Sequence, residues 1–156
     1  MQTCNHIELK KSLFLDSPKF GQIEYANEDI IKMISPIYGF GELQNFILTG
    51  YKGSFDLLYL LASSENKDIS FILIDLKTVF NRTDISLSDY DLASLKVKDI
   101  EELNIYGILT IPVEPLQTTV NMKAPIFINR SLQIGKQIIL AKENLSIRTL
   151  LSTLKC

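Results

Sequence analysis

The chain contains few residues that could support catalysis or metal binding. His6 is the single histidine, and it lies in a polar N-terminal stretch beside Cys4. A Ser/His/Asp or Cys/His arrangement needs a histidine held in place by a rigid element, so neither is expected. Cys4 and His6 offer two ligands, whereas a structural zinc site needs four. We therefore expect no metal, no cofactor and no catalytic centre, and hence no enzyme.

Acidic side chains are the other group that could do chemistry. General acid–base catalysis needs carboxyl groups in a cleft that shifts a pKa. The sequence around these acids predicts no such cleft, so we interpret them as a solvated acidic face that a partner protein could contact. They are Asp89, Asp91, Asp99, Glu101 and Glu102.

A loop bounded by proline and glycine carries apolar side chains suited to protein contact. It runs from Ser35 to Gly41 and holds Ile37, Tyr38 and Phe40. Large apolar and aromatic side chains carry much of the binding energy of protein interfaces. For Phe40 an equally good interpretation is that it closes one end of a barrel. The two glycines of the loop lack the third glycine of a dinucleotide-binding fingerprint, so they predict a turn.

The segment Thr118–Leu140 predicts a β-hairpin. Its two apolar runs, Ile126–Ile128 and Ile138–Leu140, are rich in β-branched residues, which suit a half-buried pleated surface. Pro125 has no N–H to give to a sheet, so it is expected at a strand start or at an edge. An open edge there could accept a partner's strand, unless the N-terminal strand of the chain covers it.

Other apolar runs predict a mostly β fold. Strands are expected at 21–25, 30–34, 46–49, 56–62, 69–76 and 105–113, with the first two paired. Ser88, with Asp91 three residues on, predicts the N-cap of a short helix that runs to Lys96, and 97–103 predicts a further helical turn. Apolar residues at 147, 150, 151 and 154 have helical spacing and predict an amphipathic tail helix within 145–156.

These elements predict a small, strongly bent antiparallel β-barrel-like domain with one or two short helices. The length of 156 residues suits one domain, expected over 12–156 after a loosely ordered extension at 1–11. The net charge of −2 predicts no strong attraction to nucleic acid, yet residues 61–114 hold ten acids and five bases, and 115–156 hold six bases and one acid. One acidic and one basic face are therefore expected.

The amino-acid sequence of the hairpin segment resembles that of a known family. Residues 121–129 read NMKAPIFIN and 135–140 read GKQIIL, which is similar to the signature of the FliW family. Upstream, FGQI at 20–23, DII at 29–31 and GF at 39–40 follow the order of that family. The resemblance covers about residues 13–151. It implies a compact β-barrel-like fold.

The same resemblance implies a cytoplasmic regulator of flagellum assembly. Members of the family bind newly made flagellin and also bind the translational repressor CsrA, which relieves repression of flagellin synthesis. Flagellin and CsrA are the expected partners, without direct nucleic-acid or membrane binding. The expected contact residues are the loop and acidic residues named above together with Asn121, Lys123, Pro125 and Asn129.

Two alternatives come from other functional classes. A nucleic-acid-binding barrel could use the basic C-terminal third, and it would show a steep dependence of binding on salt. A small enzyme would need a deep pocket lined by buried acids. The cysteines Cys4 and Cys156 are expected to be free thiols, as is usual in the cytosol, and no segment resembles a signal peptide or a membrane span.

Overall fold

The computed structural model describes residues 12–54, 57–78, 85–142 and 144–154. The extension predicted at 1–11 lies outside these ranges, as do Cys4, His6 and Cys156. The strands are β1 (Leu13–Ser17), β2 (Gly21–Tyr25), β3 (Ile30–Met33), β4 (Asn45–Gly50), β5 (Leu58–Ser63), β6 (Ser70–Asp75), β7 (Asn104–Thr110), β8 (Thr119–Asn129), β9 (Ile134–Gln137) and β10 (Thr149–Leu150). The described residues form one α-helix, α1 (Asp89–Ser94), and short 3-10 turns at Asn27–Asp29, Ile100–Glu102, Pro115–Gln117 and Leu151–Thr153.

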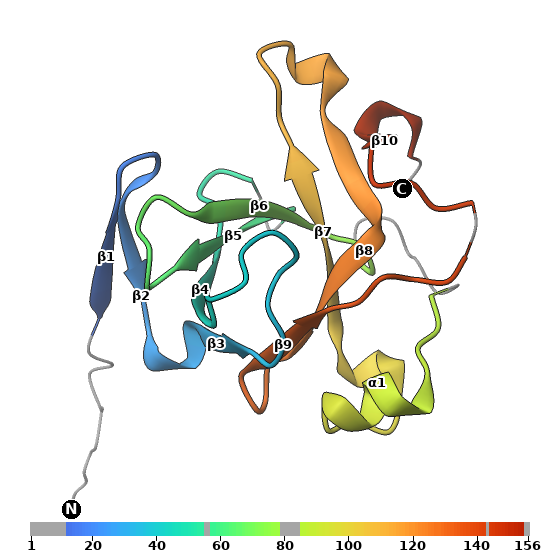
Figure 1. The fold of residues 1–156 in the computed structure, drawn as a ribbon. Coiled ribbons are helices and arrows are strands. Elements are labelled where there is room, and N and C mark those ends of the chain that lie inside the picture. The colour runs from blue at the N-terminus through green and yellow to red at the C-terminus, as the bar shows by residue number, and fades with distance from the viewer. Residues whose placement is uncertain (1–11, 55–56, 79–84, 143, 155–156) are drawn as a thin grey trace, which may run out of the picture.

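Strands β3 to β9 close into a barrel (Figure 1). The sheet runs in the order β8-β7-β6-β5-β4-β3-β9, and β9 pairs again with β8. The prediction of a mainly β, barrel-like fold is confirmed. One seam differs from an all-antiparallel barrel, because β3 and β9 are parallel. Seven strands cannot alternate in direction all the way round a closed ring, so at least one neighbouring pair must be parallel.

Strand β8 contains a wide bulge beside β7. Tyr106 lies opposite Ile126, but Ile108 lies opposite Asn121, so Gly107 alone faces four residues of β8, 122–125. A side chain at Gly107 would come within 2.5 Å of Val120, which explains the glycine. Bulges bend a strand and sharpen its twist.

The sequence predicted Pro125 at a strand start or at an edge, but Pro125 lies in the middle of this bulge, inside β8. The missing N–H is tolerated because 122–125 make no ladder bonds to β7. On the other side of β8 the Pro125 carbonyl accepts a hydrogen bond from Ile138 N at 3.1 Å. The edge is thus covered by the chain that follows β9, and not by the N-terminal strand.

The hairpin of β7 and β8 projects beyond the barrel wall (Figure 1). Strand β6 pairs with β7 at Tyr106, Gly107 and Ile108, whereas β7 and β8 stay paired as far as Thr110 and Thr119. The turn Pro115–Gln117 lies near the end of this projection. We call residues 109–119 the arm.

The predicted tail helix is wrong for the described residues. Thr149 and Leu150 form β10 and pair with Val120 and Thr119, and a 3-10 turn follows at Leu151–Thr153. Leu151 and Leu154 do pack against the largest apolar cluster. The apolar spacing therefore predicted correctly that these side chains are partly buried, but it did not indicate a helix. Pairing with an exposed strand of the arm satisfies the backbone here in place of helical hydrogen bonds.

The strand pair predicted from residues 21–25 and 30–34 is also wrong. Both strands exist, but β2 pairs with β1, and β3 pairs with β4 and β9. The β1–β2 hairpin packs outside the barrel, where Leu15 and Ile23 meet Leu60 of β5. The local hydrophobic pattern predicts a strand, but it does not predict the strand with which it pairs.

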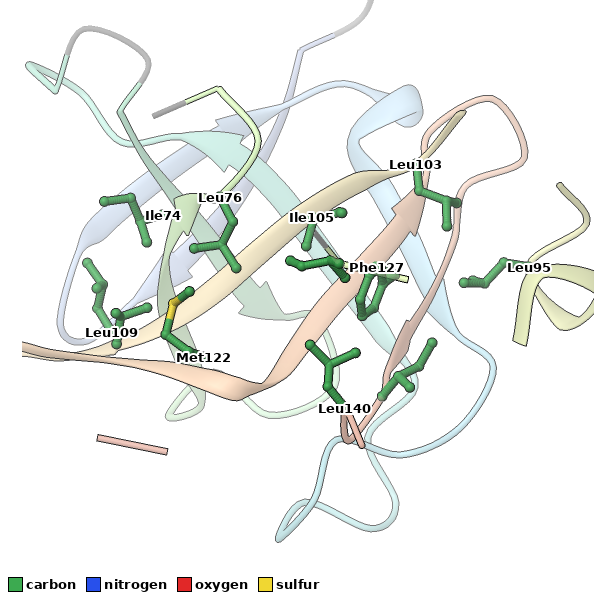
Figure 2. Close-up of a cluster of buried hydrophobic side chains, with 12 residues drawn as sticks. Ile74, Leu76, Leu95, Leu103, Ile105, Leu109, Met122, Phe127 and Leu140 are labelled. Atoms are coloured by element: carbon green, nitrogen blue, oxygen red, sulfur yellow. The ribbon is translucent and has the colours of Figure 1, made fainter. Parts of the chain in front are cut away.

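The largest apolar cluster packs against the outer face of β6, β7 and β8 (Figure 2), whereas side chains that alternate with it, such as Ile126 and Ile128, fill the barrel interior. Phe127 is fully buried and lies between Ile105 and Leu140 in this view. Leu95 reaches the cluster from the end of α1, whose N-cap is Ser88 as predicted: the Ser88 hydroxyl accepts from Asp91 N at 3.1 Å. The helix ends at Ser94, two residues earlier than predicted, and the next turn is the 3-10 turn Ile100–Glu102.

Candidate functional site

An apolar groove of ≈ 360 Å³ lies where the loop after β3 meets the bulge of β8. It brings together residues that are far apart in the sequence, and among them are five of the predicted contact residues: Ile37, Tyr38, Phe40, Asn121 and Lys123. The remaining lining residues are Phe71, Ile108, Ala124, Gln137, Ile139 and Ile147. The groove is the site that best suits docking of another protein, because its lining is mostly apolar and open to solvent.

The predicted docking loop has one exposed side chain and two that face inward. Tyr38 is 61% exposed, whereas Ile37 is 1% exposed and belongs to the core. Phe40 packs edge-to-face on Phe71 with the ring centroids 5.0 Å apart, and it also joins the core cluster beneath the groove. The barrel-closing interpretation of Phe40 therefore describes its packing. Ile37 and Phe40 form the groove floor, and Tyr38 forms its rim.

Gln137 connects the loop to the bulge, and it was not among the predicted contact residues. Its side-chain oxygen accepts from Tyr38 N at 2.9 Å, and its amide nitrogen donates to the Ala124 carbonyl at 3.0 Å. Gln137 is 5% exposed, so both bonds are shielded from water. A polar residue inside an apolar motif was the available signal, but its partners could not be read from spacing.

The bulge itself is held by Asn121. Its side-chain oxygen accepts from Lys123 N at 3.1 Å and from Ala124 N at 2.9 Å. Asn121 thus supports the groove wall by tying down local backbone. Lys123, the one charged residue in the lining, donates from Nζ to the Lys142 carbonyl at 2.9 Å.

Beneath the groove, Tyr106 is buried in the same core cluster as Ile37 and Phe40. Burial raises the pKa of the Tyr106 hydroxyl far above its ordinary value, so this side chain stays neutral at physiological pH. The groove floor therefore contributes no charge of its own.

The acidic residues lie elsewhere, around α1 and the turn after it. Asp91 forms an ion pair with Lys136 at 3.0 Å, and Glu101 forms one with Lys77 at 3.3 Å. Asp99 and Glu102 cap the turn Ile100–Glu102 reciprocally. Most of these acids thus have structural tasks, and none of them lines the groove.

Asn129 also has a structural task. It is 5% exposed, and its amide nitrogen donates to the Leu95 carbonyl at 2.9 Å, which fastens the end of α1 to the end of β8. Its oxygen accepts from Leu132 N at 3.3 Å in the turn toward β9. Asn129 is therefore not available as a surface contact.

We expect Asn129→Ala to lower the free energy of unfolding by about 1–3 kcal/mol, because it leaves the buried Leu95 carbonyl without its donor. Chemical denaturation measures this. Asn27→Ala, at an exposed position in a 3-10 turn, is the matched control and should change the value by less than about 0.5 kcal/mol. Equal effects of the two substitutions would contradict the structural role.

A larger hollow of ≈ 440 Å³ lies between the β1–β2 hairpin and the ends of β4 and β5. Phe20, Tyr51, Lys19 and Lys52 are part of its lining, and it contains no predicted contact residue. We favour the groove as the functional site, because it brings together five of the predicted contact residues and the larger hollow contains none of them.

Within the described ranges, no three His, Cys, Asp or Glu side chains gather in a way that could hold a metal ion. No helix in the described part of the chain is long and apolar enough to cross a membrane.

Comparison with known proteins places the chain in a family. The model of the FliW protein family matches residues 14–151. The chain belongs to the FliW family. It is 37% identical over 135 residues to the flagellar assembly factor FliW of Thermosipho africanus, which covers 86% of this chain and 92% of that protein. It is 34% identical over 128 residues to the flagellar assembly factor FliW of Natranaerobius thermophilus, with 81% and 83% covered.

A solved FliW structure has the same fold. The crystal structure of a flagellar assembly factor FliW superposes with a TM-score of 0.77 at 29% identity, covering 88% of this chain and 96% of that one. The FliW family model spans β1 to β10, so it includes both walls of the groove and the arm.

Proposed function

We propose that this protein is a cytoplasmic flagellar assembly factor that binds flagellin and the repressor CsrA, and so couples flagellin synthesis to assembly. The observation that carries the proposal is membership of the FliW family, whose relatives are named flagellar assembly factors. In this role the protein acts by binding and not by catalysis.

The groove is the proposed docking site for flagellin. Tyr38, Ile139 and Ile147 are 61%, 54% and 59% exposed around a floor of buried apolar side chains. A cluster of exposed apolar groups around a hollow is typical of a protein-binding site, because covering it removes apolar surface from water. Gln137 and Asn121 hold the walls in place before the partner arrives, which reduces the entropy lost on binding.

The acidic region around α1 is the proposed contact for CsrA. Bound there, it would place negative charge near a protein that binds RNA, and would repel the RNA backbone. CsrA bound to this protein would have lower affinity for RNA, and by linkage RNA-bound CsrA would bind this protein more weakly by the same factor. Asp89 and Glu101 are the exposed acids best placed for this role, because neither takes part in a helix or turn cap.

The test of the proposed function is direct binding to purified flagellin and purified CsrA. We expect each to bind, and we expect added flagellin to displace CsrA. A protein that binds neither would refute the partner assignment, and a complex of all three would refute the exchange between partners.

We expect Asp89→Asn with Glu101→Gln to weaken the antagonism of CsrA–RNA binding several-fold at low salt, because long-range charge repulsion depends on the number of exposed acids. Competition of labelled RNA for CsrA measures this. Asp68→Asn with Glu42→Gln, two exposed acids elsewhere, is the matched control. The proposed role of the acidic region would be abandoned if neutralising all five predicted acids left the antagonism unchanged.

Nucleic-acid binding by the basic C-terminal third is the less favoured alternative, because the relatives point to flagellum assembly. Filter binding at low salt would reveal it through a steep salt dependence.

A further inference from the structure

The arm continues one face of the sheet that lines the groove. In the antiparallel register Ile108 lies opposite Asn121, and Thr110 lies opposite Thr119, which itself pairs with Leu150. Residues directly opposite each other and residues two apart on a strand share a face of the sheet. Leu150 of β10, 36% exposed, therefore lies on the same face as the groove residues Ile108 and Asn121.

The end of the arm carries two of the most exposed apolar side chains in the described part of the chain. Val113 is fully exposed, and Leu116 is 74% exposed in the turn Pro115–Gln117. No core cluster includes either of them. Single exposed apolar residues are common, but two that are three positions apart at the end of a projecting hairpin are suited to anchor a partner. We call Val113 and Leu116 the arm tip.

Charge indicates which kind of segment would lie along this surface. Arg148 is exposed next to the lining residue Ile147, whereas the arm contains Glu114 and no base, so the positive charge lies at the groove end of this surface. Lys123 stands in the groove itself. An occupant with acidic side chains beside an apolar face would match both features.

We infer that the partner segment that fills the groove extends along the arm and is held at a second point by Val113 and Leu116. The occupant is an elongated segment of flagellin, apolar toward this protein and acidic near Lys123. From Ile108 to Val113 the arm spans roughly 17 Å at ~3.3 Å per residue, which a helix covers in about 11 residues. This inference rests on the proposed docking of flagellin in the groove.

The test compares three variants of the full chain for binding to monomeric flagellin. The tip variant, Val113→Ser with Leu116→Ser, should weaken binding about tenfold. The groove variant, Ile139→Asp, should weaken it more. The control, Phe14→Ser with Leu132→Ser, removes two half-exposed apolar residues away from both and should bind normally. Thermal unfolding should be unchanged in the tip variant, because its side chains are in solvent.

The outcomes separate this inference from the proposed function. If the tip variant binds like the unmodified protein while the groove variant loses binding, the arm contact is refuted and groove docking stands. If neither variant loses binding, groove docking itself is refuted.

A photo-crosslinking residue at position 113 should attach to flagellin, and failure to crosslink would overturn the arm contact. Lys123→Gln should reduce the salt dependence of binding, and an unchanged salt dependence would overturn the acidic character of the segment.

Discussion

Replacing Phe127 with alanine is expected to lower the free energy of unfolding by about 3–5 kcal/mol. Phe127 is fully buried between the outer face of the barrel wall and the segments that cover it, in the cluster that joins strands β6, β7 and β8 to the end of α1 (Figure 2). Removing the ring takes away its burial and leaves a cavity that strands paired on both sides cannot collapse to fill. Such a loss is a large part of the ~5–15 kcal/mol that stabilises a typical domain.

Equilibrium denaturation followed by circular dichroism would measure the loss. Phe14→Ala is the matched control, because it makes the same chemical change at a position that is 54% exposed, on the β1–β2 hairpin. We expect that control to cost less than about 1 kcal/mol. A Phe127→Ala protein as stable as the control would contradict the core described here.

Replacing Ile139 with aspartate is expected to weaken flagellin binding by about 30-fold or more. Ile139 is 54% exposed on the groove, so the free protein should tolerate the charge. In the complex the carboxylate would be covered by an apolar partner surface without a counter-charge, and burying an unpaired charge is costly. If the partner segment is acidic, repulsion would add to the loss.

Calorimetric titration of flagellin into the two proteins would measure this change. Leu132→Asp, at a position that is 52% exposed in the turn between β8 and β9 and outside the groove, is the matched control. It introduces the same charge and should leave the affinity within about twofold. Equal weakening by both substitutions would point to net charge, and no weakening by Ile139→Asp would remove the groove as the docking site.

Local features of the chain predicted much of the fold. Runs such as 69–76 and 105–113 are short, β-branched and bounded by turn residues, so they predict strands whatever their partners are. Ser88 predicted a helix start for the same reason, because an N-cap bonds only to residues two or three positions away. A hairpin after β8 was predictable, but its second strand was placed wrongly: β9 is Ile134–Gln137, and the predicted run Ile138–Leu140 follows it outside the strand.

Long-range pairing set the features that could not be predicted. The partner of β2 and the parallel seam between β3 and β9 depend on how the ring closes. Apolar residues at 147, 150, 151 and 154 have the spacing of a helix. The chain instead forms β10, because Thr149 and Leu150 pair with the edge of β8. Pro125 was expected at a strand start, since the bulge that accommodates it depends on Gly107 of another strand.

The residues of the candidate site divide in the same way, into those predictable from local features and those that depend on long-range contacts. Tyr38 and Lys123 were predicted as contacts from residue type and from the FliW resemblance, and the groove brings them together. Asn129 was predicted with them, but burial and its bond to Leu95 give it a structural task. Gln137 and Ile147 could not be found, because their place in the groove depends on how the chain turns after β9.

The bond between Gln137 and Tyr38 joins residues 99 positions apart, so the groove can form only after both residues have been synthesised. A ribosome makes the loop with Tyr38 first, and the glutamine that fixes it follows 99 residues later. A nascent chain that stops before residue 137 therefore lacks one wall of the groove as well as the last strand of the barrel. The proposed docking surface is therefore complete only in chains that extend past residue 137.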